Sequence, residues 1–203
     1  MSGLPRDDGV VTDVELELAD WRARVAALYL SDVDLTGFRA GRDELFAHHP
    51  QSPVPPESFT GLRYFPLNPG AVVEADLRPA SGELVIDTGG PDGRITYRRV
   101  GIAATQWGDL TVWWIDAYGG GLFVPVRDGT SGTETYGGGR YLTDTVKGTH
   151  GRGLVWLGDH TVRLDMNHLY NPSCAYDEEW ACPLAPPENR VELEIRAGEL
   201  NYP

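Results

Sequence analysis

Residues 110–116 read LTVWWID and residues 122–127 read LFVPVR, and the short stretch AYGGG separates them. Valine, isoleucine, threonine and aromatic residues favour strands, whereas glycine favours turns. Because the connection is too short for a helical crossover, the two strands are expected to pair antiparallel. Trp113 and Trp114 then point to opposite faces of one strand, so one is expected in the core and the other against a cavity, an outer helix or a partner.

The same pattern of short β-branched and aromatic runs between turn residues continues on both sides of this hairpin. Further strands are predicted at residues 62–67, 72–77, 83–87, 95–105, 161–167 and 191–195. In the last two of these, apolar and polar residues alternate, which indicates one buried face for each strand. Because most connections are short, we expect a mainly antiparallel, all-β fold of about eight strands, either a barrel or a sandwich.

Two helices are predicted ahead of the first strand. Apolar residues recur at helical spacing in residues 13–30, where Thr12 and Glu15 fit a capping box. Thr36 is expected to cap a second helix at residues 37–48, which a proline-rich stretch ends. Residues 1–11 are expected to form a flexible leader, and residues 12–203 a single β-rich domain with the helices packed against it.

The composition restricts the classes of partner. The formal net charge is −13, and such a surface repels phosphate backbones and anionic lipids, so neither nucleic acid nor a membrane is expected as a partner. The first twenty residues lack the basic start and the apolar run of a secretory signal. We therefore expect a cytoplasmic protein whose two cysteines remain thiols, and the sequence does not indicate its oligomeric state.

The densest unusual segment is RDGTSGTETYGGGRY at residues 127–141. Three successive glycines are expected where the backbone needs a positive φ or approaches another group closely. One interpretation is a wide hairpin loop with a bulge. The other is a rim loop whose Glu134, Tyr136 and Arg140 face a ligand. A phosphate-binding loop is not indicated, because the Gly-Lys-Ser/Thr ending and a following helix are missing.

A second segment, residues 165–190, reads DMNHLYNPSCAYDEEWACPLAPPENR. Its prolines predict a long loop that is shaped in advance, as an ordered binding loop would be. The alternative is a structural cover over one end of the barrel, in which Asp165, Asn167, Glu188 and Asn189 bond backbone groups of the loop.

Cys174, Cys182 and His168 carry ligand types that suit zinc, but the indication is weak, because the spacing between the cysteines is not that of a zinc knuckle and no fourth ligand is specified. No metal is therefore predicted, and no cofactor is identified. Standard hydrolase, metalloprotease and dehydrogenase motifs are also missing from the sequence.

Several stretches together resemble an uncharacterised family, catalogued as domain of unknown function number sixteen eighty-four. They include RDELF at residues 42–46, FTGLRYFP at 59–66, RDGTSG at 127–132, ETYGGGRYL at 134–142, YNPSCAY at 170–176, CPL at 182–184 and PENR at 187–190. The resemblance implies no known activity and supplies no catalytic residue.

Our leading hypothesis is a small-molecule-binding β-barrel whose polar mouth is built by the two segments, while the strands provide an apolar wall. Its ligand would carry an anionic or carbonyl group held by Arg140 and Tyr136. Two alternatives remain: an enzyme with Glu134 or Glu188 as general base beside Tyr136, and a structural or protein-interaction module. The candidate ligand-binding residues are Arg127, Asp128, Glu134, Tyr136, Arg140, Asp165, Asn167, Tyr170, Tyr176, Glu188 and Asn189.

Overall fold

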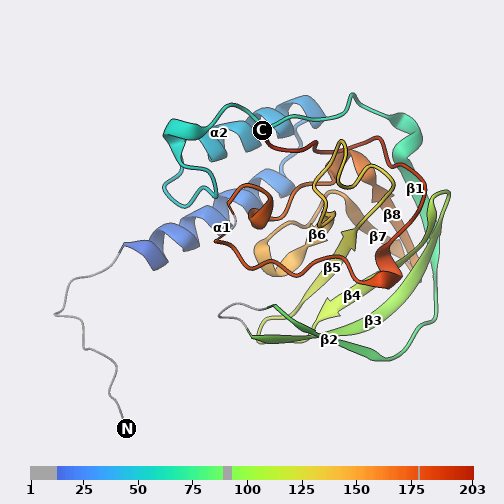
Figure 1. The fold of residues 1–203 in the computed structure, drawn as a ribbon. Coiled ribbons are helices and arrows are strands. Elements are labelled where there is room, and N and C mark those ends of the chain that lie inside the picture. The colour runs from blue at the N-terminus through green and yellow to red at the C-terminus, as the bar shows by residue number, and fades with distance from the viewer. Residues whose placement is uncertain (1–12, 89–92, 178) are drawn as a thin grey trace, which may run out of the picture.

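The computed structural model describes residues 13–88, 93–177 and 179–203, and Figure 1 shows a curled sheet with two helices beside it. The predicted leader, residues 1–11, and the predicted capping residue Thr12 lie outside the described residues. The strands are β1 (Val72–Arg78), β2 (Glu83–Asp87), β3 (Arg94–Thr105), β4 (Gly108–Ile115), β5 (Gly121–Val126), β6 (Arg140–Asp144), β7 (Leu154–Gly158) and β8 (Thr161–Asp165).

The eight strands form one antiparallel sheet in the order β6-β5-β4-β3-β1-β8-β7, with β2 attached to β3 alone. One side of the long strand β3 pairs first with β2, at Glu83 and Arg98, and then with β1, at Leu77 and Ala103. The sheet curls into a half-barrel. It is not a closed barrel, because its two edge strands, β6 and β7, do not pair with each other. The predicted antiparallel β-fold of about eight strands with N-terminal helices is confirmed.

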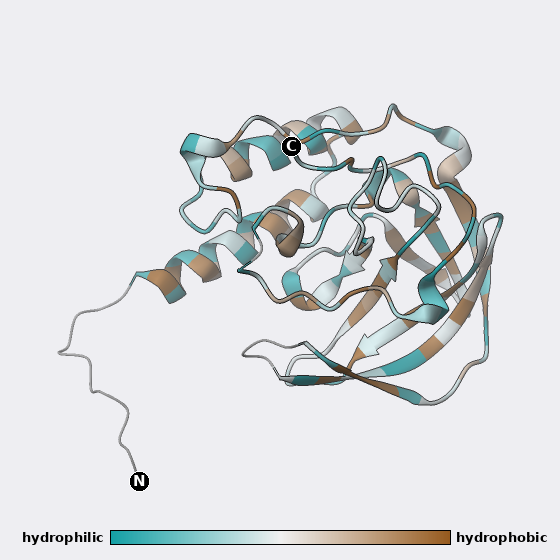
Figure 2. Ribbon diagram, viewed as in Figure 1, coloured by the Kyte–Doolittle hydropathy of each residue, from teal (hydrophilic) through white to brown (hydrophobic). Residues whose placement is uncertain are grey.

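The helices α1 (Val14–Leu30) and α2 (Leu35–His48) lie side by side along one side of the half-barrel (Figure 1). Figure 2 shows hydrophobic and hydrophilic positions mixed along α1, and among its residues only Tyr29 is buried. Asp34 caps α2 by accepting the Gly37 N–H at 2.8 Å, so the predicted cap at Thr36 is wrong. Among the described residues, no helix is both long enough and apolar enough to cross a lipid bilayer.

Besides a smaller cluster that includes Phe46 of α2, the core has two main parts, an aliphatic cluster on the sheet and an aromatic layer. The first part contains Leu110, Val112 and Leu164, among other aliphatic side chains, and the second contains Tyr97, Trp113 and Phe123. Trp113 is fully buried and Trp114 only partly, which answers which of the two tryptophans belongs to the core. The aromatic rings meet edge to face, as between Phe123 and Tyr141 at 4.8 Å.

Two predicted strands are wrong. Residues 62–67 contribute a single bridge, from Tyr64 to Glu199, and residues 191–195 form no strand. The second error has a clear cause. The N–H of Ile195 donates to the side chain of Asp128, and its carbonyl accepts from the side chain of Arg140. These side chains take the place of a neighbouring strand. The sequence reading also missed β6 and β7, which are short and flanked by glycines.

Candidate functional site

The Gly-rich loop (residues 127–141) and the Pro/Cys loop (residues 165–190) lie against each other, although they are distant in sequence. Tyr141 and Tyr170 exchange two backbone hydrogen bonds at 2.8 and 3.0 Å. The Tyr136 hydroxyl also donates to Cys174 Sγ at 3.5 Å. The C-terminal segment (residues 191–203) packs against both loops, so that the predicted mouth is crossed by polypeptide.

Arg140 is the centre of this region, and its side chain is only 1% exposed. Its Nη1 donates to the carbonyls of Ala197 at 2.5 Å and Glu199 at 3.1 Å, and its Nη2 donates to Ile195 O at 3.0 Å and Asp128 Oδ1 at 3.3 Å. Among the described residues, only Nε of this guanidinium lacks a partner. Arg140 and Asp128 therefore have the contacts of residues that hold the C-terminal segment in place.

Two glycines allow the Gly-rich loop to pack this closely. Gly139 has φ +94°, and a Cβ there would lie 2.7 Å from Val126 O. At Gly129 a Cβ would lie 2.5 Å from Glu192 O in the C-terminal segment. The glycine-rich composition is thus explained by a positive φ at one position and a close backbone approach at another.

A buried ion pair links the C-terminal segment to α2. Arg42 Nη2 donates to Glu199 Oε2 at 2.8 Å, and both side chains are almost fully buried. The Tyr176 hydroxyl and the backbone N–H of Asn171 donate to the same carboxylate. Burial raises the pKa of Glu199, and the nearby Arg42 opposes that rise. The hydroxyl of Tyr176, a candidate binding residue, is therefore already hydrogen-bonded to Glu199.

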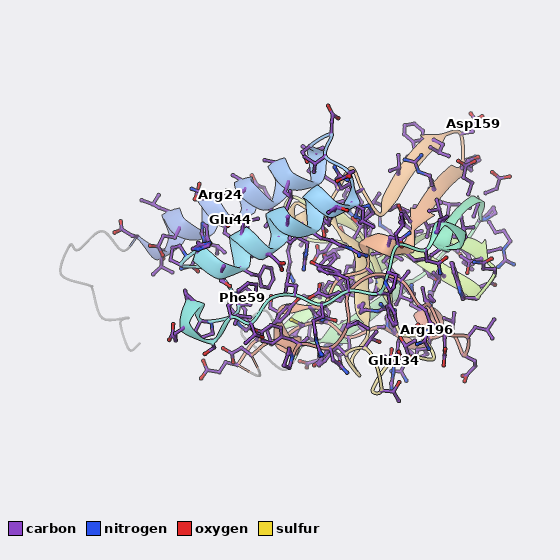
Figure 3. The ribbon with its side chains drawn as sticks, turned by 90° about the horizontal axis from the view of Figure 1, so that it is seen from above. Arg24, Glu44, Phe59, Glu134, Asp159 and Arg196 are labelled. Carbon is purple, nitrogen blue, oxygen red and sulfur yellow. The ribbon has the colours of Figure 1, made fainter. Side chains whose placement is uncertain are left out.

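The other candidates of the Gly-rich and Pro/Cys loops are spread over several places. Glu134 pairs with Arg196 at 2.7 Å on the surface, where Figure 3 labels both residues on a different side of the molecule from Asp159. Glu188 pairs with Arg99 at 2.5 Å. Asn189 is buried, accepts from Trp113 Nε1 at 2.7 Å and donates to Thr111 O at 2.9 Å.

Three remaining candidates also have protein partners. Asn167 exchanges two hydrogen bonds of 2.9 Å with the backbone of Asn68. The Tyr170 hydroxyl lies 3.1 Å from Thr149 Oγ1. Arg127 forms an isolated parallel bridge with Arg190 through its backbone. The structure thus brings the two predicted segments together, while their polar side chains bond to the protein itself.

A polar pocket of about 490 Å³ lies between the end of α1, the β7–β8 hairpin and the start of the Pro/Cys loop. We call it the α1–β7 pocket. It is lined by Tyr29, Leu30, Ser31, Asp32, Val33, Val72, Gly151, Arg152, Gly153, Val155, Arg163, Asp165 and His168. Asp165 and His168 were named from the sequence, and the two arginines were not. The pocket therefore combines predicted and unpredicted charged residues.

His168 is 8% exposed, and its Nε2 lies 3.7 Å from Asp165 Oδ2. Burial lowers the pKa of His168 to about 4, with Arg152, Arg39 and Arg42 adding to that effect and Asp165 opposing it. The ring is therefore neutral at pH 7. Among the described residues, its Nδ1 has no hydrogen-bond partner.

Arg152 also lines this pocket, and its Nη2 donates to the carbonyls of Ser31 at 2.5 Å and Val33 at 2.6 Å. Its buried Nε has no partner within the described part of the chain. The Tyr29 hydroxyl makes no hydrogen bond of ordinary geometry to a described residue, although Arg42 is near enough to oppose the burial that raises the pKa of Tyr29 to about 12. Three residues that line this pocket therefore each carry a buried polar atom without a partner in the described chain.

A second, apolar pocket of about 540 Å³ opens from the interior of the half-barrel. Its lining includes Leu77, Val112, Leu122, Leu154 and Val162, with His160 among its few polar residues. This is the apolar wall that the barrel hypothesis requires. None of the residues predicted for the polar mouth lines it.

No group of three or more His, Cys, Asp or Glu residues within the described ranges could hold a metal ion. The three weak metal candidates do not form one site. His168 lines the α1–β7 pocket, whereas Cys174 and Cys182 contact each other further along the Pro/Cys loop.

The sequence carried a signal for one of the residues it missed. Arg42 lies four positions from both Phe38 and Phe46, and all three are buried, so an arginine within an apolar helical stripe marked a buried charge. Arg152, Arg163 and Glu199 stand in no recognisable motif.

The family model described as "Protein of unknown function (DUF1684)" matches residues 57–200. The chain is also similar to the solution NMR structure of the uncharacterized protein from gene locus rrnAC0354 of Haloarcula marismortui. The two share 32% identity with a TM-score of 0.54, and the match covers 93% of this chain and 97% of that one. The search of curated proteins found no match.

Proposed function

Because the chain belongs to the DUF1684 family of proteins of unknown function, we propose its function from geometry alone: it binds a small molecule with an anionic or carbonyl group in the α1–β7 pocket. The observation that carries this proposal is the pair of buried atoms without partners, Arg152 Nε and His168 Nδ1, in residues that line one pocket. Buried polar atoms normally have partners, so a ligand or ordered water is expected to provide them.

The charges near the pocket favour an anionic or carbonyl group over a cation. Arg152 and Arg163 line the pocket, and Arg39 and Arg42 are close enough to affect His168. Asp32 and Asp165 also line it, but Asp165 is engaged through Oδ1 by the N–H and side-chain amide of Asn167. In a protein with a net charge of −13, this local group of arginines gives a carboxylate or phosphate one favourable place to bind.

His168 is expected to provide a hydrogen-bond acceptor beside the arginines of the pocket. With Nε2 facing the Asp165 carboxylate, the proton of the neutral ring is assigned to Nε2, which leaves Nδ1 as an acceptor. A ligand that places a hydroxyl or N–H near its carboxylate, carbonyl or phosphate fits both His168 and Arg152. Small hydroxy acids and sugar phosphates are therefore the first compounds to screen.

The enzymatic alternative through Glu134 or Glu188 receives no comparable support, because both carboxylates form ion pairs and neither lines a pocket described above. A structural role is favoured for Asp128, Arg140, Asn167 and Asn189, which bond the protein itself. A cytoplasmic location, and the exclusion of nucleic acids and membranes as partners, stay predictions from charge and sequence.

A thermal-shift screen of hydroxy acids and sugar phosphates tests the proposal, using wild type, Arg163→Ala and the control Arg98→Ala. Arg163 is exposed at the pocket, and Arg98 is exposed on β3 outside it. We expect at least one compound to raise the melting temperature of wild type and Arg98→Ala, and to bind Arg163→Ala about tenfold or more weakly, because a charge-assisted hydrogen bond is lost.

Histidine NMR provides a second readout, since a bound anion would raise the pKa of His168 from about 4. The proposal is overturned if no compound stabilises the wild type, or if Arg163→Ala binds as tightly as the wild type does.

A further inference from the structure

The Pro/Cys loop holds its two cysteines next to each other. Cys174 lies in the short 3-10 turn Ser173–Ala175, and Cys182 directly precedes Pro183. The backbone N–H of Cys174 donates to Cys182 Sγ at 3.3 Å. Both cysteines are free thiols of intermediate exposure. The fold therefore brings together two thiols of residues that are not fully buried.

The two sulfurs have different surroundings. Hydrogen bonds from the Cys174 thiol and backbone N–H lower the pKa of Cys182 to about 6, and the positive charge of Lys147 contributes further. The same thiol–thiol hydrogen bond and burial raise the pKa of Cys174. Cys182 is therefore the cysteine of this pair that is expected to lose its proton first as the pH rises. The thiolate is the reactive form of cysteine.

Rigid elements hold both ends of the loop. The Tyr141 hydroxyl from β6 donates to Pro183 O at 2.7 Å, and the Tyr136 hydroxyl donates to Cys174 Sγ at 3.5 Å. Pro172 and Pro183 are both buried. Each cysteine adjoins a segment that is held by the Gly-rich loop or the core. The fold itself therefore keeps the two cysteines close together.

We propose that Cys182 and Cys174 form a peroxide-reactive dithiol, in which Cys182 is the attacking thiol and Cys174 the resolving thiol. The Cys182 thiolate attacks one oxygen of a hydroperoxide, the O–O bond breaks, and the leaving alkoxide or hydroxide takes a proton to become an alcohol or water. Cys182 is thereby oxidised to a sulfenic acid. Cys174 then attacks that sulfur, the S–O bond breaks, and water leaves as the disulfide forms.

Zinc binding does not explain the pair equally well, because two thiols provide only half of a tetrahedral set and no third ligand stands with them among the described residues. Burial as inert small apolar residues does not explain it either, because neither side chain is fully buried. The dithiol is separate from the α1–β7 pocket, so its chemistry does not depend on the proposed function.

The test uses the full chain, reduced and then freed of reductant. With hydrogen peroxide we expect the intact mass to fall by two hydrogen atoms and peptide mapping to show a bond between residues 174 and 182. With limiting iodoacetamide at pH 7, Cys182 is expected to be alkylated about tenfold or more faster than Cys174. Cys174→Ser is expected to stop at a sulfenic acid that dimedone traps, and Cys182→Ser to show neither product.

One further variant separates chemistry from folding. Tyr136→Phe removes the hydroxyl beside Cys174 but leaves both thiols, so disulfide formation is expected to persist; circular dichroism verifies that every variant is folded. Equal alkylation of the two thiols, an intermolecular disulfide alone, or an unchanged mass after peroxide treatment of the folded wild type would each overturn the proposal.

Discussion

The Arg140 network and the α1–β7 pocket each contain an arginine that donates to backbone carbonyls, yet their hydrogen bonding differs. Arg140 uses four donor contacts on Asp128 and three carbonyls of the C-terminal segment. In the pocket, Arg152 and His168 each keep a nitrogen without a partner in the described chain, as Arg140 does at Nε. Arg152 and His168 line the pocket, however, whereas Arg140 lines neither pocket described above. Unpartnered polar atoms in residues beside a cavity are therefore what distinguishes the proposed binding site from the Arg140 network.

Replacing Arg140 gives the largest expected effect. Arg140→Met leaves the Asp128 carboxylate buried without its cation, and we expect the free energy of unfolding to fall by about 3–5 kcal/mol. Urea denaturation measures the change. Arg163→Met in the pocket is expected to change stability by less than about 0.5 kcal/mol.

If Arg140→Met does not fold, the double variant Asp128→Asn/Arg140→Met provides the measurement, because it removes the unpaired charge and is expected to recover part of the stability. Equal effects at Arg140 and Arg163 would break the contrast between the two regions.

The pH dependence of stability tests the pocket. An unfolded histidine titrates near pH 6.5, whereas the pKa of native His168 is about 4. Between these values only the unfolded state binds the proton, so stability present above about pH 6.5 is lost as the pH falls to about 4, by about 2–3 kcal/mol. The difference between wild type and His168→Gln isolates this residue, and parallel stability–pH curves for the two proteins would contradict it.

Two glycines with the same φ sharpen the comparison at the smallest scale. Gly139 and Gly61 both have φ +94°, but a Cβ meets Val126 O at 2.7 Å at the first and nothing within 4 Å at the second. Gly61→Ala is expected to cost about 1 kcal/mol for backbone strain alone, and Gly139→Ala about 1–2 kcal/mol more for the clash. Equal losses in urea denaturation would show that the Gly-rich loop is not tightly packed.

The sequence predicted those parts of the fold in which local pattern and tertiary environment agree. The hairpin β4–β5 was readable because strand-forming residues flank a glycine turn. Strand β6 was not, because all five of its residues are buried, Arg140 and Asp144 included, so period-two alternation is lost. Residues 191–195 alternate like a strand, but side chains rather than a strand satisfy the backbone of Ile195.

The candidate site was less predictable than the fold. Asp165 and His168 belonged to a segment singled out for its composition, and both line the pocket. Arg152 comes from the loop before β7 and Arg163 from β8, and only the sheet topology places them beside α1. Local sequence does not encode such a convergence, and no motif spacing could have revealed it.

The ion pair between Arg42 and Glu199 joins residues 157 positions apart. During synthesis, Arg42 leaves the ribosome long before Glu199 does, so this ion pair cannot form until Glu199 has been added. Contacts of such long range slow folding. We therefore expect the helices and the early hairpins to form first, and the completed native state to appear as a late, slow kinetic phase controlled by docking of the C-terminal segment.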